Sequence, residues 1–362
     1  MKANRNLGDV LELKDLARSQ LTISRVATID NLPNNYSITK INEVGVFVGA
    51  NGAHFLDISN ARKPKIIGSV ALIHDNMYAN QFLGIRGKHA LFSIAYQGVE
   101  IVDINDLTTP KSLGLNKNYG FPYKMLIANS LGITNTNILD ITDTLNPRAV
   151  KEFARPSPDH VIYSESLVYI PGGEDIEIIS LAPSENFKQL TTLKCPFHYG
   201  FSNLERLSEK YLLAASGNGL AVAEISETAD SLKLKALVKL DIIPDNFVLT
   251  DRVCITRTIR NPDDVLISLN VKNPDIPSLS YSLLFENHDL WYFMANKDFL
   301  ACLCTAGLER QVPKKSVLVL TNNTTLPGII GEIKIEMSSG FWLVDNCIYE
   351  FTKEGMNIHE IH

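Results

Sequence analysis

Histidine, carboxylate and aromatic residues recur at one kind of position in this sequence, shortly before an apolar segment begins. Four of the eight histidines lie there, in the phrases LIHDNMY, SPDHVIY, CPFHYGF and ENHDLWY. Imidazole nitrogens and carboxylate oxygens bind divalent metals, and a carboxylate beside a metal-bound water can act as a general base. If these histidines converge, they predict a metal site and a metal-dependent hydrolase or lyase. The histidines are His74, His160, His198 and His288, and the nearby acids are Asp75, Asp159, Asp245, Glu286 and Asp289.

Two other interpretations of these positions stay open. Each histidine can be a loop residue that is paired locally with the backbone or with a neighbouring aspartate. Alternatively, the same loops form a site for a peptide or a small molecule without a metal. Aromatic residues that open the following strands either pack in the core or serve as a binding platform. We take four of them as candidate ligand contacts, namely Tyr78, Tyr123, Tyr199 and Trp291.

No other catalytic or cofactor motif is found. There is no Gly-x-Ser-x-Gly motif, and the glycine-rich phrases GANG (49–52), PGGED (171–175) and SGNG (216–219) are typical of hairpin turns rather than phosphate loops. The five cysteines lack Cys-x-x-Cys spacing, so we expect reduced core residues, with Cys302 and Cys304 on one face of a strand. We therefore predict no cofactor, apart from the divalent metal considered above.

Composition and charge limit the partners. Hydrophobic residues make up 45% and charged residues 20% of the 362 residues, which is ordinary for a soluble globular chain. The net charge of −6 argues against nucleic acid, because phosphate binding needs concentrated Lys and Arg. We expect a protein or a small-molecule ligand as the partner.

The compartment is predicted from targeting signals. The first 20 residues contain no apolar core of a signal peptide, and no stretch approaches 18 consecutive apolar residues. No transmembrane segment is therefore expected. We take the cytoplasm as the default, with export without a leader or a truncated signal peptide as alternatives.

One phrase is repeated along the chain and predicts the architecture. FLDISNARKPKIIG, VEIVDINDLTTPKSLG and ILDITDTLNPRAV each join an apolar run, an aspartate and a proline-led segment. Weaker copies without the aspartate follow, which we align at Ser180, Glu224, Ser268, Val319 and Glu360. A period of about 43 residues built from short Val- and Ile-rich runs is typical of propeller blades with four antiparallel strands, and it disfavours helical repeats. Asp57, Asp103 and Asp140 should end the third strand and accept backbone N–H groups in the next turn, while the proline opens the outermost strand.

The count of such units predicts a closed, all-β propeller that forms a single domain over residues 1–362. Eight blades are our first choice and seven the second. The last unit ends after its third strand, so we expect residues 19–28 to supply the missing fourth strand and to close the ring. Residues 1–18 are then an N-terminal extension, and the stretch 8–20 has some helical character.

The three strong copies of the phrase resemble the LVIVD-repeat family, and the resemblance is good over about residues 45–152. It implies a bacterial or archaeal β-propeller, usually of unassigned function and often at the cell surface. It implies no catalytic residues.

We therefore expect a non-enzymatic binding or interaction scaffold. In propellers, ligands usually contact the connections from the second to the third strand and from the fourth strand to the next blade. The long connection 307–315 is a further candidate contact. The alternative function is the metal-dependent hydrolase or lyase, and a lectin-like surface module is a third possibility that would require export.

Overall fold

The computed structural model describes most of the chain. It covers residues 10–30, 32, 35–49, 52–73, 81–94, 97–122, 124–134, 136–153, 162–164, 167–171, 174–181, 187–195, 201–216, 219–228, 231–240, 244–250, 253–258, 264–285, 288–306, 315–322, 327–335, 340–352 and 355–362.

Within these residues the protein is all-β, with two three-residue 3-10 helices, η1 (Leu13–Asp15) and η2 (Lys117–Tyr119). Its strands form eight sheets, each built on four antiparallel strands, and these are the eight blades of a β-propeller. Blades 1 to 7 take these four strands in sequence order, whereas blade 8 takes its fourth strand from the N-terminal part of the chain. The prediction of eight blades is confirmed, and the seven-blade alternative is wrong. We call the strands of each blade a to d.

Contacts divide the chain into two compact units, which are described separately. The first unit holds blades 4 to 7, from residue 160 to residue 337, together with residues 1–24 and 361–362. Blade 4 consists of β15 (Ile162–Ser164), β16 (Leu167–Pro171), β17 (Asp175–Ser180) and β18 (Gln189–Lys194). Blade 5 consists of β19 (Phe201–Arg206), β20 (Tyr211–Ser216), β21 (Gly219–Ile225) and β22 (Leu232–Lys239). Blade 6 consists of β23 (Pro244–Thr250), β24 (Val253–Thr258), β25 (Asp264–Asn270) and β26 (Ser278–Phe285). Blade 7 consists of β27 (His288–Ala295), β28 (Phe299–Ala306), β29 (Lys315–Thr321) and β30 (Ile329–Ile335).

The second unit holds blades 1, 2, 3 and 8, in residues 25–159 and 338–360. Blade 1 consists of β3 (Asn35–Ile41), β4 (Val44–Gly49), β5 (Gly52–Asp57) and β6 (Lys65–Val70). Blade 2 consists of β7 (Gln81–Arg86), β8 (His89–Ile94), β9 (Gly98–Asp103) and β10 (Lys111–Asn116). Blade 3 consists of β11 (Met125–Ala128), β12 (Leu131–Thr134), β13 (Asn137–Asp140) and β14 (Arg148–Glu152). Blade 8 consists of β31 (Phe341–Val344), β32 (Cys347–Phe351), β33 (Gly355–Ile361) and β2 (Ile23–Asp30).

The core of each unit lies between consecutive blades. One apolar cluster joins Leu220 and Val222 of blade 5 to Ile267 and Leu269 of blade 6, and similar clusters join blades 1 and 2, 2 and 3, 4 and 5, and 6 and 7. Because a blade is covered on both faces, its middle strands read as continuous apolar runs instead of alternating ones. The a strands of successive blades are neighbours, with β7 against both β3 and β11 in one unit and β23 against both β19 and β27 in the other.

The repeated aspartate ends strand c and organises the turn that follows, as predicted. The side chains of Asp57, Asp103 and Asp140 each accept a backbone N–H group from two residues further on, at 2.9 Å. Hydrogen bonds from the turn lower the pKa of Asp57 and of Asp140. The turn is therefore built from side-chain-to-backbone hydrogen bonds.

The repeat extends further than the aspartates indicate. In blade 6 Asn270 ends strand c and accepts the N–H of Lys272 at 2.9 Å, so the equivalent residue is Asn270 and not Ser268. In blade 2, the residue after the repeated aspartate, Ile104, donates its backbone N–H to the carbonyl oxygen of Lys88. In blade 7, the backbone N–H of Asn322 makes the equivalent bond to the carbonyl oxygen of Asp298. The blade 7 copy is therefore at Thr321 and not at Val319. An amide oxygen accepts the same N–H as a carboxylate, which is why the sequence search missed the copy in blade 6.

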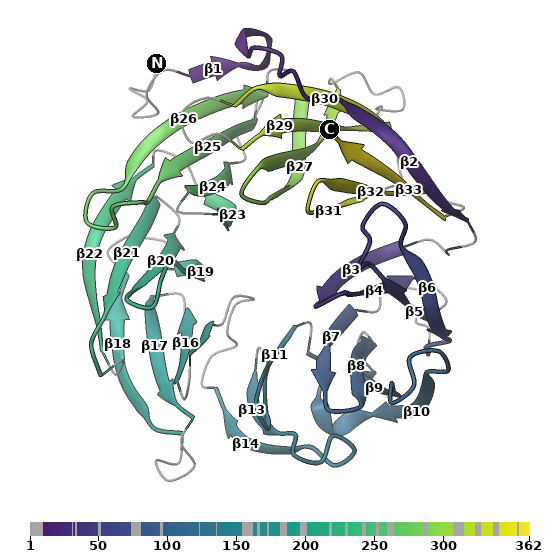
Figure 1. Ribbon diagram of the computed structural model, residues 1–362. Coiled ribbons are helices and arrows are strands. Elements are labelled where there is room, and N and C mark those ends of the chain that lie inside the picture. The colour runs from purple at the N-terminus through teal and green to yellow at the C-terminus, as the bar shows by residue number, and fades with distance from the viewer. Residues whose placement is uncertain are drawn as a thin grey trace. The chain divides into compact units, whose positions relative to one another are not determined.

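The N-terminal strand β2 completes blade 8 (Figure 1), as predicted from the missing fourth strand. Thr22 and His362 exchange two backbone hydrogen bonds of 2.9 and 3.2 Å, and the Thr28 hydroxyl donates to Asn357 at 3.1 Å. β2 is thus the edge strand of this blade, and without it the outer edge of β33 would be unpaired.

The residues before β2 differ from the helical expectation for 8–20. β1 (Val10–Glu12) runs parallel to β26 as a fifth strand on blade 6 (Figure 1). Leu16 is buried among residues of blades 6 and 7, and Ala17 and Ser19 bond to Ile329 of β30 at 2.9 and 2.7 Å. Open strand edges offer backbone partners that a short isolated helix lacks, so tertiary pairing overrides the local preference.

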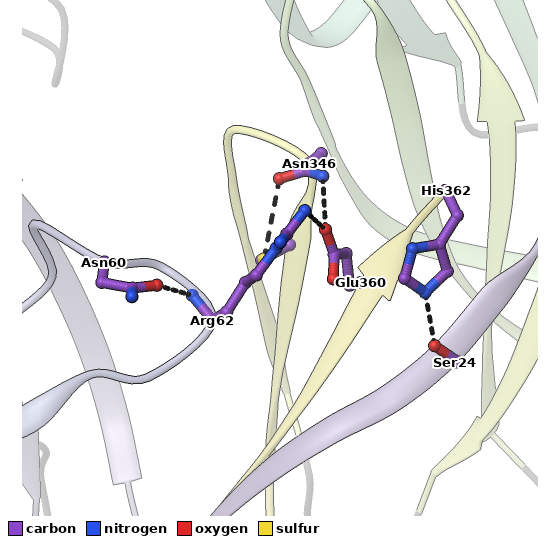
Figure 2. A network of polar contacts seen from close by, with 7 residues as sticks. Ser24, Asn60, Arg62, Asn346, Glu360 and His362 are labelled. Atoms are coloured by element: carbon purple, nitrogen blue, oxygen red, sulfur yellow. Dashed lines mark hydrogen bonds and ion pairs between the residues drawn. The ribbon is translucent and has the colours of Figure 1, made fainter.

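A polar network links blade 1 to blade 8 within the second unit (Figure 2). Arg62, in the turn between β5 and β6, forms an ion pair with Glu360 of β33, whose side chain is almost wholly buried. Asn346 donates to the same carboxylate at 3.1 Å, and the Asn60 side chain accepts the Arg62 N–H. The ion pair keeps a buried carboxylate compensated.

Candidate functional site

Most residues of the predicted site lie outside the described part of the chain. These are His74, His160 and His198 among the histidines, and Tyr78, Tyr123 and Tyr199 among the aromatics. His288 is the first residue of β27, and nothing is described of its side chain. Over the described residues, no group of three or more His, Cys, Asp or Glu side chains could hold a metal ion. The four-histidine site therefore stays a prediction.

Trp291 is the one predicted ligand contact whose side chain is described, and it lies at a β-bulge. Leu290 pairs with Cys304 and Tyr292 with Leu303, so Trp291 is the extra residue of β27. A bulge bends the strand and re-aims the side chain of the extra residue. The Trp291 side chain is 51% exposed, and the ammonium group of Lys315 lies 4.5 Å from its ring centroid.

A buried carboxylate from the neighbouring blade fixes the strand at this bulge. Asp264, the first residue of β25, accepts the backbone N–H of Leu290 at 2.6 Å and is only 5% exposed. Hydrogen bonds to charged groups contribute about 1.5–3 kcal/mol, so the residue before Trp291 is held firmly. Sequence reasoning missed Asp264. The available signal was an acid at the start of an apolar run, DVLISLN.

The same bulge position recurs in other blades. Blades 1, 5, 6 and 7 each have one extra residue in strand a. In each of them the residue that follows the extra one pairs with the fifth residue of strand b. The four extra residues are Tyr36, Ser202, Asp245 and Trp291. A bulge in strand a therefore recurs at one position of the blade, and the residue type at this position differs between blades.

A second buried carboxylate positions the connection that leads to His74. Glu100 of β9 is 1% exposed and accepts the N–H of Ile73 at 2.7 Å and the hydroxyl of Ser112 at 2.5 Å. Ile73 directly precedes His74 and is itself exposed, as is Phe121 in the connection from blade 2 to blade 3. Phe121 was not among the aromatics predicted from sequence, because it precedes the strand by several residues.

Three of the five cysteines, Cys302, Cys304 and Cys347, are buried as predicted for core residues, whereas Cys195 is partly exposed. Cys302 and Cys304 are buried on β28, and burial raises the pKa of the Cys304 thiol to about 12 and that of Cys302 well above its usual value. Both thiols are therefore protonated at neutral pH and are poor nucleophiles.

The fold defines the class of protein as a β-propeller, with a loop-bearing edge at which Trp291 and Lys315 meet. Solved structures with this fold resemble the chain at low sequence identity. Sqt1 of Saccharomyces cerevisiae aligns over 96% of this chain and 100% of its own, with a TM-score of 0.60 and 11% identity. The computationally designed protein Ika8 aligns over 93% and 99%, with a TM-score of 0.59 and 8% identity. Hsv2 of Kluyveromyces lactis aligns over 85% and 99%, with a TM-score of 0.54 and 10% identity. At such identities the likeness shows the fold alone.

Sequence comparison adds no family. No protein-family model matches the chain, and no curated protein sequence matches it. The resemblance to the LVIVD-repeat family therefore stays a prediction. Among the described residues, no helix has the length and apolar character needed to span a membrane.

Proposed function

We propose that this protein is a non-enzymatic binding scaffold whose contact surface includes the b–c and d–a connections of its blades. The observation that carries the proposal is the pair formed by Trp291 and Lys315. Lys315 opens strand c directly after the connection 307–314, and Trp291 lies near the start of strand a after the d–a connection. Both residues thus belong to the side of blade 7 where these connections emerge.

The pair has the properties of a binding contact. A half-exposed indole offers a large apolar area to a partner, and Trp is among the residues that contribute most to binding energy at interfaces. The bulge and the Asp264 hydrogen bond hold the backbone beside it, so little conformational entropy would be lost on binding. Lys315 adds a positive charge next to the ring.

Tryptophan fluorescence provides a direct test. The chain has two tryptophans, and Trp342 is buried in blade 8, so Trp291 supplies the solvent-sensitive signal. Candidate peptides and small molecules should change the emission of the native protein but not that of the Trp291→Phe variant. Ligands found in this way should bind at least about tenfold more weakly to Trp291→Ala.

The matched control is Ile276→Ala, because Ile276 is a strongly exposed apolar residue in a c–d turn of blade 6. This variant should bind as the native protein does, and all variants should keep the native melting temperature. Equal binding by Trp291→Ala and the native protein would contradict the proposal. Elemental analysis tests the metal-dependent hydrolase or lyase separately: stoichiometric metal that is lost in the variant His160→Ala/His288→Ala would favour the enzyme over the scaffold.

A further inference from the structure

The protein uses one of its own segments to cover the outer edges of two blades. We call residues 10–19 the strap. Its strand β1 pairs with residues 282–284 of β26. At the other end of the strap, Ala17 and Ser19 form two backbone hydrogen bonds with Ile329 of β30. Blade 6 already has the four strands of the other blades, so β1 is an addition to a complete sheet. Figure 1 shows β1 beside β26.

The outer edges of blades 1 to 3 have no such cover among the described residues. β6, β10 and β14 are the last strands of their sheets, so half of their backbone N–H and C=O groups face outward. Each strand also carries one exposed aliphatic side chain, Ile66, Leu113 or Val150. By contrast, no large hydrophobic side chain of the strap-covered strands β26 and β30 is exposed.

The uncovered strands β6, β10 and β14 also differ from the strap-covered strand β26 in their charged residues. β6, β10 and β14 begin with the exposed basic residues Lys65, Lys111 and Arg148, each directly after a proline. Each basic residue lies across from the aspartate that ends strand c. In blade 6 the equivalent pair is neutral, Asn270 and Ser278. The outer edges of blades 1 to 3 thus combine outward backbone groups, an aliphatic side chain and an exposed basic residue that faces an aspartate of strand c.

We propose that the outer edges of blades 1 to 3 bind an extended segment of a partner protein that carries aliphatic and acidic residues, by addition of a strand to the blade. Strand addition supplies affinity through main-chain hydrogen bonds and specificity through alternate side chains. The strap shows the mode on this fold and has the same chemistry, with Leu11 and Leu13 next to Glu12 and Asp15. Acidic side chains that precede the paired segment of the partner would reach Lys65, Lys111 or Arg148, because a segment parallel to the outer strand, as β1 is to β26, runs in the same direction as that strand.

The bulges in the outer strands are compatible with this mode. Leu113 and Val150 are themselves the extra residues of bulges in β10 and β14, and such bulges normally protect an edge. However, β26 has its own bulge at Ser280, and β1 still pairs with it two residues further on. Pairing is therefore expected to start just past each bulge, beside Ile66, Leu113 or Val150, with flanking residues of the partner reaching back to the basic residue that opens the strand.

A peptide with the sequence of residues 8–20, GDVLELKDLARSQ, is the probe, and it is added to the full-length protein. Hydrogen exchange should show new protection of amides in β6, β10 or β14. Fluorescence anisotropy should show affinity reduced at least about tenfold in the variant Ile66→Ser/Leu113→Ser/Val150→Ser. The charge variant Lys65→Gln/Lys111→Gln/Arg148→Gln should also bind more weakly, with a smaller salt dependence.

Three controls keep the proposal falsifiable. A scrambled peptide should not bind, Trp291→Ala should bind the probe normally, and both triple variants should keep the native melting temperature because the changed residues are exposed. Protection confined to β26 would mean that the probe only displaces the strap, and it would overturn the proposal. So would unchanged affinity in the serine variant. If the native protein forms concentration-dependent dimers and the serine variant does not, the partner is a second copy of this chain.

Discussion

Single side chains set the turns of this fold through a pair of hydrogen bonds. In blade 3, Asp140 accepts the N–H of Thr142 and Asp143 accepts that of Leu145, at 2.9 and 3.0 Å. In blade 6, Asn270 and Asn273 form the same two contacts, at 2.9 and 3.1 Å. The turn therefore requires an oxygen acceptor at this position and not a negative charge.

Replacing Asp140 tests this requirement. Asp140→Asn should leave stability nearly unchanged, whereas Asp140→Ala should cost about 1 kcal/mol because the N–H of Thr142 loses its acceptor. The free energy of unfolding from urea titration is the measurement. A large loss in the Asn variant would show that the charge itself matters, for example through Arg148, the cross-strand partner of Asp140.

Glu350 of β32 is the clearest pH-sensitive group. Its carboxylate bonds to His359 at 2.8 Å and to Asn357 at 3.0 Å, both on β33. Burial favours the neutral form, but these hydrogen bonds outweigh it, so the pKa of Glu350 lies below its ordinary value of 4.5. A pKa that is lower in the folded state means that ionised Glu350 stabilises the fold above pH 4.5.

This contribution should disappear as the pH falls from 4.5 through the folded-state pKa of Glu350. The variant Glu350→Gln should lose about 2 kcal/mol at pH 7 and should show a shallower decline in acid than the native protein. Melting temperatures measured across this range compare the two. Parallel curves would contradict a stabilising role for ionised Glu350.

Among the elements, the junction between β2 and β33 has the tightest steric requirement. A Cβ atom added at Gly355 would lie 1.9 Å from the carbonyl oxygen of Ile29. This glycine opens strand c of blade 8, and Gly219 opens strand c of blade 5 with a Cβ position 2.1 Å from Val238 O. Strand c therefore begins with glycine where the end of strand d passes close to it.

Gly355→Ala should destabilise the protein by about 1–3 kcal/mol, because either β2 or β33 must shift to relieve the contact. Faster amide exchange in residues 23–30 should accompany the loss, while exchange in blade 5 stays unchanged. Gly87→Ala is the contrasting variant, since no atom lies within 4 Å of the added Cβ there. Gly87 has a positive φ of 58°, so its replacement isolates backbone strain from steric overlap.

At the scale of the whole molecule, the strap connects the outer edges of two blades of the first unit. Before β2 joins β33 in blade 8, the strap pairs with the outer strands of blades 6 and 7 and places Leu16 between them. Propeller blades otherwise contact mainly their neighbours through the clusters between them. A segment that crosses several outer edges adds couplings that those clusters do not provide.

Leu16→Ala should therefore cost about 2–5 kcal/mol, the usual range for a buried leucine. Amide exchange should accelerate in both β26 and β30, because one side chain holds the strap against two blades. Ile276→Ala, at an exposed position, should change stability by less than about 0.5 kcal/mol. Acceleration limited to residues 10–19 would show that the strap does not stabilise the blades.

The candidate site was only partly predictable from sequence. Trp291 was selected as an aromatic at the start of an inner strand, but its exposure and its contact with Lys315 depend on a bulge that pairing with β28 creates. Asp264 was not selected, because its role requires contact with Leu290 in the next blade. Such cross-blade contacts leave no local pattern in the sequence.

The amino-acid sequence alone determined the all-β class, the eight repeats, the aspartate turns and the pairing of the N-terminal strand with the last blade. These features follow from local periodicity, turn chemistry and the missing fourth strand of the last unit, and each of them can be read from neighbouring residues or by counting. Only the tertiary structure decided that residues 10–12 form a strand on β26, that Asn270 replaces the aspartate, and that Asp264 supports the residue before Trp291. Each of these depends on which backbone or side-chain group a distant segment presents, and local preference cannot encode that.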